Sequence, residues 1–294
     1  MEKQLNTTPN ISVIRKKEKK SLSLGKIILY IFMAIVGFLQ LFPLLWLFDY
    51  SLLNSGEFFG DAILQIPSPP EWETYISAFT QGNVLPYFFN SVLVTFVSVA
   101  LTAFVSILLA YAFTRMKWRF SALFLNIILL GMMIPIHATL LPNFIIFNEV
   151  GMLNSYWALI LPYTAFNIPI SMFIVTGFME TIPRSIEEAA VMDGAGIWRI
   201  LFKVIFPITK PAIATISVVN FINCWNEFIM AYTFITEDTF KTLPFSIIQF
   251  VGQYSSNYGA QFAVMSLIAI PSIIMYLFFT DEINKGLMAG SIKG

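Results

Sequence analysis

Long apolar windows, separated by short polar stretches, dominate the chain from about residue 27 onwards. A helix needs roughly 20 apolar residues to cross the hydrocarbon core of a bilayer. Six windows are long enough: residues 27–48, 88–113, 120–144, 156–178, 212–235 and 261–280. We therefore predict an all-α integral membrane protein with six transmembrane helices, in which an N-terminal tail (1–26) precedes a transmembrane domain (27–294).

Lysine and arginine lie almost entirely on one side of this six-span arrangement. Sixteen of the seventeen fall in the N-terminal tail, in the loop after the second span, in the segment after the fourth span and at the C-terminus, and Lys241 is the exception. Short loops that cross a membrane avoid these residues. We therefore predict that both termini are cytoplasmic, including a C-terminal tail over residues 281–294.

Composition agrees with the membrane assignment and excludes several other classes. Apolar residues make up 57% of the 294 residues and charged residues only 12%, against about 25% charged in a typical soluble domain. The net charge of zero argues against a nucleic-acid partner. One cysteine, Cys224, excludes an internal disulfide, and no Cys/His cluster suggests a metal site. The chain has no G-x-x-x-x-G-K-[ST] loop with which to bind ATP phosphates.

A charged segment, residues 183–207, separates the fourth and fifth windows. Ser185 and Glu188 have the spacing of a capping box, which predicts a helix start just after Pro183. Gly194 and Gly196 permit a sharp turn. A second apolar stripe then follows at helical spacing: Ile197, Ile200, Leu201, Val204 and Ile205. We predict two short helices joined by a glycine hinge.

Two interpretations of this segment remain open on periodicity alone. The helices can rest on lipid headgroups as amphipathic elements, or they can dock on another protein. The first helix is acidic, which suits anionic headgroups badly. Its apolar face is small, with Ala189 and Ala190 beside Ile186, and small residues fit a protein groove better than an acyl layer.

The segment resembles the signature of ABC importer permeases, Glu-Ala-Ala…Gly…Ile-x-Leu-Pro. EAAVMDG is followed by nine residues and VIFP, in which Val204 and Phe206 replace Ile and Leu. In that family the segment is a cytoplasmic coupling helix that sits in a cleft of a separate ATPase subunit. The resemblance thus implies a type I importer permease fold and a set of ATPase-coupling residues: Glu187, Glu188, Ala189, Ala190, Asp193 and Gly194.

The resemblance extends from about Asn90 to Gly294 and points to the carbohydrate-uptake branch. The motifs that carry it are WNEF at 225–228, KTLPFSIIQFVGQYSSNYGAQFAVM and the terminal KGLMAGSIKG. Within the branch the chain is similar to the second permease of maltose- and oligosaccharide-type importers. The branch places the C-terminal tail between the ATPase subunits, which implies four contact residues: Lys285, Gly286, Gly290 and Lys293. Met288 and Ser291 depart from the Thr and Ala often found there.

What the resemblance implies for partners follows from the family's assembly. One six-span subunit supplies half of a translocation pathway, so a second permease is expected, with two ATPase subunits that bind ATP and magnesium. A solute-binding protein outside the cell delivers the sugar. The chain itself is then a permease in the bacterial plasma membrane, with no catalytic residues and no cofactor.

Polar residues inside a span tend to face the interior of a bundle, and the fifth window has the densest set: Asn220, Asn223, Trp225, Asn226 and Glu227. Asn220, Asn223 and Glu227 are spaced to share one helix face. Amide and carboxylate groups bond sugar hydroxyls, which makes these five the candidate substrate pathway. The alternative is that they hold helices together. The only histidine, His137, more simply packs or hydrogen-bonds, and prolines 135, 162, 169 and 271 predict kinks or opened backbone.

The segment from about Glu237 to Ala260 is long for a connection between spans and is predicted to lie outside the cell. Its tip holds amides and hydroxyls that can compete for sugar hydrogen bonds: Gln253, Tyr254, Ser255, Ser256, Asn257 and Tyr258. The resemblance favours contact with the binding protein. The alternative is a membrane-interface anchor made by aromatics such as Phe245 and Phe250.

A rival function is that of an ion-coupled secondary transporter that works alone. Such a transporter needs intramembrane carboxylates and usually carries inverted repeats. Glu227 is the only deeply placed carboxylate, the sequence shows no repeat, and this function leaves the charged segment unexplained.

Overall fold

The computed structural model describes residues 24–54, 56, 58, 66–252 and 256–291, with side chains up to Thr280. All regular structure in these ranges is helical. The chain divides into two units, residues 1–45 and 46–294. Helix α1 (Leu24–Tyr50) begins in the first unit, where it is an apolar helix without buried residues.

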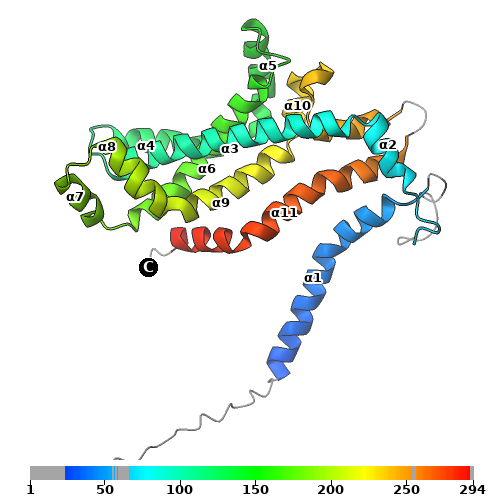
Figure 1. Ribbon diagram of the computed structural model, residues 1–294, viewed down its shortest axis with the longest axis horizontal. Coiled ribbons are helices and arrows are strands. Elements are labelled where there is room, and N and C mark those ends of the chain that lie inside the picture. Colours follow the sequence, from blue (N-terminus) through cyan, green and yellow to red (C-terminus); the bar gives the residue numbers. More distant parts are fainter. Residues whose placement is uncertain (1–23, 55, 57, 59–65, 253–255, 292–294) are drawn as a thin grey trace, which may run out of the picture. The chain divides into compact units, whose positions relative to one another are not determined.

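The second unit is built from long helices that run side by side, α3, α6, α9 and α11, with shorter helices at their ends (Figure 1). The α-helices are α2 (Glu73–Gln81), α3 (Val84–Thr114), α4 (Ser121–Leu130), α5 (Leu140–Glu149), α6 (Trp157–Glu180), α7 (Ser185–Met192), α8 (Ile197–Ile200), α9 (Phe206–Trp225), α10 (Ile229–Phe234) and α11 (Tyr258–Ser291). Short 3₁₀ helices are η1 (Gly131–Met133), η2 (Ile136–Thr139), η4 (Asp238–Phe240) and η5 (Leu243–Phe250), and η3 (Leu201–Ile205) is a π-helix.

Helices α3 and α6 form the closest packed pair of the second unit. Small hydroxyl residues line the buried face of α3 at spacings of three and four: Ser91, Thr95, Ser98, Thr102 and Ser106. Small residues let helix backbones approach closely, which is how helices associate in a bilayer that offers no hydrophobic gain. The pair therefore forms the rigid spine of this unit.

Two ends of this spine are fixed by different contacts. At the α7 end, Arg115 directly follows α3, and its side chain donates to the carbonyls of Met179 and Ile182 at the C-terminal end of α6. At the opposite end, which we call the η4 end, Asn90 of α3 accepts a hydrogen bond from the Tyr156 hydroxyl just before α6. Each end thus joins the same two helices.

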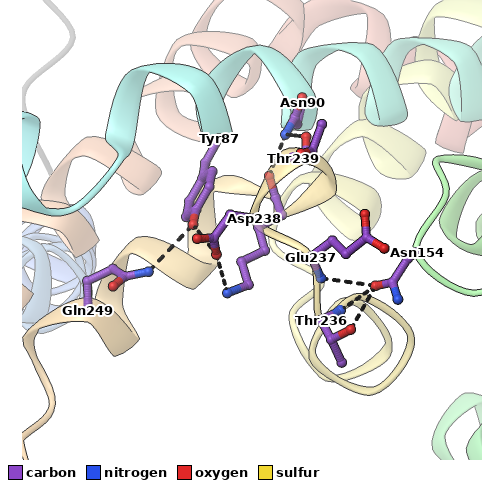
Figure 2. A network of polar contacts seen from close by, with 9 residues as sticks. Tyr87, Asn90, Asn154, Thr236, Glu237, Asp238, Thr239 and Gln249 are labelled. Carbon is purple, nitrogen blue, oxygen red and sulfur yellow. Dashed lines mark hydrogen bonds and ion pairs between the residues drawn. The ribbon is translucent and has the colours of Figure 1, made fainter.

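The η4 end also holds the segment that follows α10 (Figure 2). The Asn90 amide donates to the carbonyls of Thr239 and Lys241 at 2.9 and 2.8 Å. The Tyr87 hydroxyl lies 3.2 Å from an oxygen of Asp238. Asp238 also pairs with Lys241, whose ammonium holds the pKa of this carboxyl below its usual value.

The third predicted span is not one straight helix. Ser121–Met133 and Ile136–Glu149 meet at an angle of 96° at Ile134–Pro135. The proline has no N–H with which to continue the helical ladder. Trp118, before α4, donates to Ala112 O near the C-terminal end of α3. Asn154, after α5, is bonded at the η4 end. The bent pair therefore runs from one end of the spine to the other and is a broken span. Within the described ranges, five helices are long and apolar enough to cross a membrane, and the bent pair counted as one span makes a sixth. Pro162, Pro169 and Pro271 lie within helices that continue through them.

The fifth span also differs from the prediction. One helical run extends from Ile197 to Trp225, so the predicted second short helix is the first part of the span itself. The run passes Pro207 because the turn before it is a π-helix, in which the Phe206 N–H bonds Leu201, five residues earlier. A wider turn relieves the crowding between the proline ring and the carbonyl four residues before it.

The long segment before α11 is packed rather than extended. Phe245 and Phe250 are 4% and 6% exposed, so they belong to the protein core and not to an interfacial anchor. The predicted anchoring by these two residues is therefore wrong.

Asn154 gives a test of how the η4 end is held. Its side-chain oxygen accepts hydrogen bonds from Thr236 N, Thr236 Oγ1 and Glu237 N, and its own φ is +55° (Figure 2). Asn154→Ala removes the acceptor and strains the backbone, and should lower the free energy of unfolding by about 1–3 kcal/mol.

Asn154→Gly separates the two effects because it removes the acceptor and relieves the strain, so its midpoint should lie between those of Ala and the unchanged protein. Asn154→Asp keeps the acceptor and is the matched control. Thermal unfolding in nanodiscs, followed by tryptophan fluorescence, gives the order. Equal midpoints for all four proteins would contradict this role.

Candidate functional site

Helix α7 carries the predicted coupling residues, and it turns them in two directions. Glu188, Ala189 and Asp193 are exposed. Glu187 and Ala190 turn inward: the Glu187 carboxylate lies 2.8 Å from Arg115, and Ala190 packs on the apolar cluster at the α7 end. The predicted small-residue docking face is therefore reduced to Ala189, with Ala190 supporting the helix from behind.

The predicted capping box is absent. No side chain caps α7, and the first turn begins earlier than expected, because Ile186 N–H bonds Pro183 and Glu187 N–H bonds Arg184. Pro183 begins this turn without cost since the first N–H groups of a helix have no partner within it. Glu188 is consequently exposed with no capping role.

The turn after α7 is the predicted glycine hinge. Gly194 has φ of +74°, its N–H bonds Val191 O, and the N–H of Ala195 bonds Ala190 O. This pair of bonds is a Schellman motif, which ends a helix at a residue in the left-handed region. Gly196 is extended and starts the next helix. The hinge thus consists of Gly194 in the left-handed region and, two residues later, Gly196 in an extended conformation.

A cavity of about 750 Å³ opens between the two broken spans. One wall is the break of the third span, from Gly131 to His137, and the other is the break after α9, from Asn223 to Ile229. Between them α6 contributes Tyr163, Phe166 and Asn167. The cavity thus combines aromatic surface with amide and carboxylate groups, which is the chemistry that binds a sugar.

Glu227 lies at the break and does not continue the face of α9, which ends at Trp225. Its carboxylate accepts a hydrogen bond of 2.6 Å from the Tyr163 hydroxyl. It also accepts the N–H groups of Met230 and Ala231 at 2.8 and 3.3 Å, which are the first donors of α10. The carboxylate therefore stabilises the backbone at this break. The prediction that Glu227 shares one helix face with Asn220 and Asn223 is wrong.

The five candidate pathway residues separate into two groups. Asn223, Asn226 and Glu227 line the cavity. Asn220 is fully buried against Ser171, with its amide 2.9 Å from the hydroxyl, and the Trp225 indole is buried and donates to Ile268 O. For these two the alternative interpretation, contacts between helices, is the one that fits.

The predicted binding-protein loop and C-terminal contacts are only partly visible. Gln253, Tyr254, Ser255 and Lys293 lie outside the described residues. Ser256 precedes α11, Asn257 accepts the Ala260 N–H at its start, and Tyr258 contacts the Phe58 ring. Helix α11 continues through Lys285, Gly286 and Gly290, whose side chains are not described.

Sequence reasoning missed three cavity groups and one basic residue. His137 lines the cavity, although a packing or hydrogen-bonding role was the simpler expectation. Tyr163 and Asn167 also line it, but they lie in the fourth span, which has no dense set of polar residues. Arg115 was counted only for its charge. No local signal shows that its side chain reaches the carbonyls of Met179 and Ile182 at the C-terminal end of α6.

Comparisons with known proteins agree with this arrangement. Residues 102–287 match the family described as the binding-protein-dependent transport system inner membrane component. A putative ABC transporter permease protein, ORF2, of Caldicellulosiruptor sp. (strain Rt8B.4) is 36% identical over 265 residues, which cover 90% of this chain and 96% of that protein. The trehalose/maltose transport system permease protein MalG of Thermococcus litoralis is 30% identical over 273 residues, covering 92% and 98%.

A solved structure shares the fold. One chain in the crystal structure of a bacterial ABC transporter involved in the import of the acidic polysaccharide alginate superposes with a TM-score of 0.74 at 24% identity, covering 87% of this chain and 95% of that one. The chain therefore belongs to the family of binding-protein-dependent transport system inner membrane components, as a multi-pass permease subunit of an ABC transporter.

Proposed function

We propose that this chain forms half of the pathway of an ATP-driven sugar importer and works by alternating access. Its partners are a second, different permease, two ATPase subunits that bind ATP and magnesium, and a solute-binding protein. The observation that carries the proposal is the pairing of two features: a largely apolar cavity with amide and carboxylate groups, between the break of the third span and the end of α9, and an exposed short helix, α7, at the end of the same bundle. Relatives named for trehalose and maltose transport support the sugar class.

We propose further that the α7 end faces the cytoplasm of a bacterial cell. Arg115 and Arg184 meet there, and Lys117 and Arg119 directly follow α3. Translocated loops avoid such residues. In this orientation both termini are cytoplasmic, residues 1–26 and 281–294 are tails, and residues 183–207 form the coupling segment. Lys285, Gly286 and Gly290 of α11, together with Lys293, then contact the ATPases.

At the η4 end, outside the cell in this orientation, residues 253–258 face the binding protein. Of these residues Ser256, Asn257 and Tyr258 are described, and Asn257 accepts the N–H of Ala260 in the first turn of α11. The firm attachment of residues 236–250 to α3 gives this contact a fixed base.

A secondary transporter is the weaker proposal. It needs a carboxylate that is free to bind an ion or a proton during transport. Among the described residues, the one carboxylate that lines the cavity is Glu227, and three hydrogen bonds from Tyr163, Met230 and Ala231 already engage it. An arrangement of this kind stabilises the helix break rather than serving ion exchange.

The function is tested by reconstitution. The chain is produced with the second permease, ATPase and binding protein of its own operon and placed in proteoliposomes. ATP hydrolysis stimulated by the loaded binding protein, together with uptake of labelled maltose, trehalose or a longer oligosaccharide, is the expected result. Uptake by this chain alone, driven by an ion gradient, would overturn the proposal.

Ala189→Trp tests the docking of α7. The methyl of Ala189 is exposed, and an indole at that position does not fit a groove shaped for it, so binding of the ATPase should weaken by at least about tenfold. The measurement is co-purification of the ATPase with the permease pair, followed by stimulated ATP hydrolysis.

Lys117→Trp is the control, because this exposed residue lies at the same end of the bundle but outside α7. Both variants should insert in the membrane equally. Normal ATPase binding by Ala189→Trp would show that α7 does not dock.

Asn223→Leu tests the cavity. The change removes an amide that faces the cavity and keeps a similar side-chain volume. A lost hydrogen bond to a sugar hydroxyl is worth about 0.5–1.5 kcal/mol, so the sugar concentration for half-maximal transport should rise about two- to tenfold. ATPase binding should be unchanged.

Asn143→Leu is the matched control, since this amide bonds Thr139 and does not line the cavity. It should leave half-maximal transport where it was. Equal behaviour of the two variants would place the sugar elsewhere, on the partner permease.

A further inference from the structure

We propose that Arg115 is a positioning residue that holds the coupling helix α7 against the C-terminal ends of α3 and α6. The contacts of Arg115 with Met179, Ile182 and Glu187 are called the lock below. Glu187 belongs to this lock and does not contact the ATPase. The proposal rests on the proposed function, because it assigns a role within the same coupling segment.

The lock is built around one guanidinium. The Arg115 Nη2 atom donates to Met179 O at 2.7 Å and to Ile182 O at 2.8 Å. The Nε atom of the same side chain lies 2.8 Å from Glu187 Oε1. One planar group therefore reaches the last turn of α6, the segment that leaves it and the first turn of α7.

The two carbonyls that Arg115 engages differ: that of Met179 also accepts the N–H of Ile182, whereas that of Ile182 lies just after the helix. The last C=O groups of a helix are left outside its ladder, and Met179 and Ile182 lie at and just after the finish of α6. A positive charge at a helix C-terminus also interacts favourably with the helix dipole. Arg115 thus caps α6 from the neighbouring helix α3.

Burial makes the pair with Glu187 effective. The Arg115 and Glu187 side chains are 7% and 13% exposed. The N–H of Nε is not aimed at the carboxylate oxygen, so the contact is an ion pair without the alignment of a hydrogen bond. Removal of either partner leaves the other charge buried without its counter-ion, which is costly, although Glu187 keeps a hydrogen bond with Tyr111 and Arg115 keeps its two carbonyls.

A second arginine runs in the opposite direction. Arg184, directly before α7, donates to Thr114 O at the finish of α3 at 3.1 Å. The Thr114 hydroxyl in turn lies 3.2 Å from the Met179 sulfur. Two guanidinium groups therefore cross between α3 and the α6–α7 corner, and together they fix the direction in which α7 leaves the bundle.

Adjacent glutamates consequently have different tasks. Glu187 faces the bundle and holds α7 in place, whereas Glu188 is exposed and free to meet the ATPase. Helix α6 then leads from the lock to Tyr163 and Asn167 in the cavity wall. The lock thus adds a side-chain connection between α7 and the C-terminal end of α6 to the covalent one through residues 181–184.

The test is a double-mutant cycle in the reconstituted importer. Arg115→Ala, Glu187→Gln, the double variant and Arg115→Lys are compared with Glu188→Gln, a neighbouring carboxylate outside the lock. Two quantities are measured: the affinity of the ATPase for the permease pair, and the number of sugar molecules imported for each ATP hydrolysed.

We expect Arg115→Ala and Glu187→Gln to lower import per ATP at least about fivefold while the ATPase still binds. The double variant should be no worse than Arg115→Ala, because that single change already removes the ion pair. Import per ATP in Arg115→Lys should lie between the values of the parent and of Arg115→Ala, since a lysine keeps the charge but not the planar guanidinium that reaches both carbonyls. Glu188→Gln should instead weaken ATPase binding.

A direct structural readout separates positioning from general instability. Spin labels at Lys117→Cys and Met192→Cys report the distance between the finish of α3 and α7, and both positions are exposed whereas the native Cys224 is buried. The distance distribution should be narrow in the parent and broad in Arg115→Ala and Glu187→Gln.

Two results would overturn the proposal. One is a loss of ATPase binding in Glu187→Gln that Arg115→Ala does not share, because Glu187 would then act on the ATPase. The other is an unchanged distance distribution in both variants. Failure of the parent complex to bind an ATPase or to import sugar would contradict the proposed function itself, and the label distances still test the lock in the isolated chain.

Discussion

The close packing of α3 against α6 is the constraint on which the rest of the second unit depends. The buried positions of α3 include small hydroxyl residues, among them Ser98 and Thr102, and apolar residues such as Val94 and Ile107 that cluster with residues of α6. Both ends of the protein are then built on this pair. Arg115 joins the two helices at the α7 end, and Asn90 and Tyr156 join them at the η4 end. A spine fixed at both ends can carry a movement from one end to the other.

The two broken spans meet beside this spine. The third span bends at Pro135 and the fifth ends at Trp225, and the cavity lies between the two breaks. In a membrane, irregular backbone is tolerated only where protein or a water-filled cavity surrounds it. Glu227 supplies part of that protection by accepting the amides of α10, so the same residue that faces the cavity also maintains the break that forms it.

The sequence predicts the long apolar helices and the short helix α7 well, because a window of 20 apolar residues and a conspicuous charge distribution are both local signals. The direction in which each side chain points is not given by such local signals. Glu187 and Glu188 have the same chemistry, and only the neighbouring finish of α3 decides which one is buried. The role of Arg115 was hidden for the same reason, since its partners lie 64 to 72 positions further along the chain.

The break after α9 gave a misleading signal of a different kind. Asn220, Asn223 and Glu227 have helical spacing, and the spacing was correct as far as Trp225. The helix stops there because a carboxylate two residues later captures the next free amides, a local competition between side chain and backbone that apolar periodicity does not report. His137 reached the cavity through the bend at Pro135, whose angle no sequence pattern specified.

A cavity bounded by helix breaks also bears on how relatives of this protein diverge. The two breaks that frame the cavity are held by Pro135 and by the Glu227 carboxylate, and not by wall residues such as Asn223 or Phe166. The lock at Arg115 shares no side chain with that wall. A lineage can therefore exchange one cargo for another through a few wall substitutions while its drive mechanism is inherited unchanged.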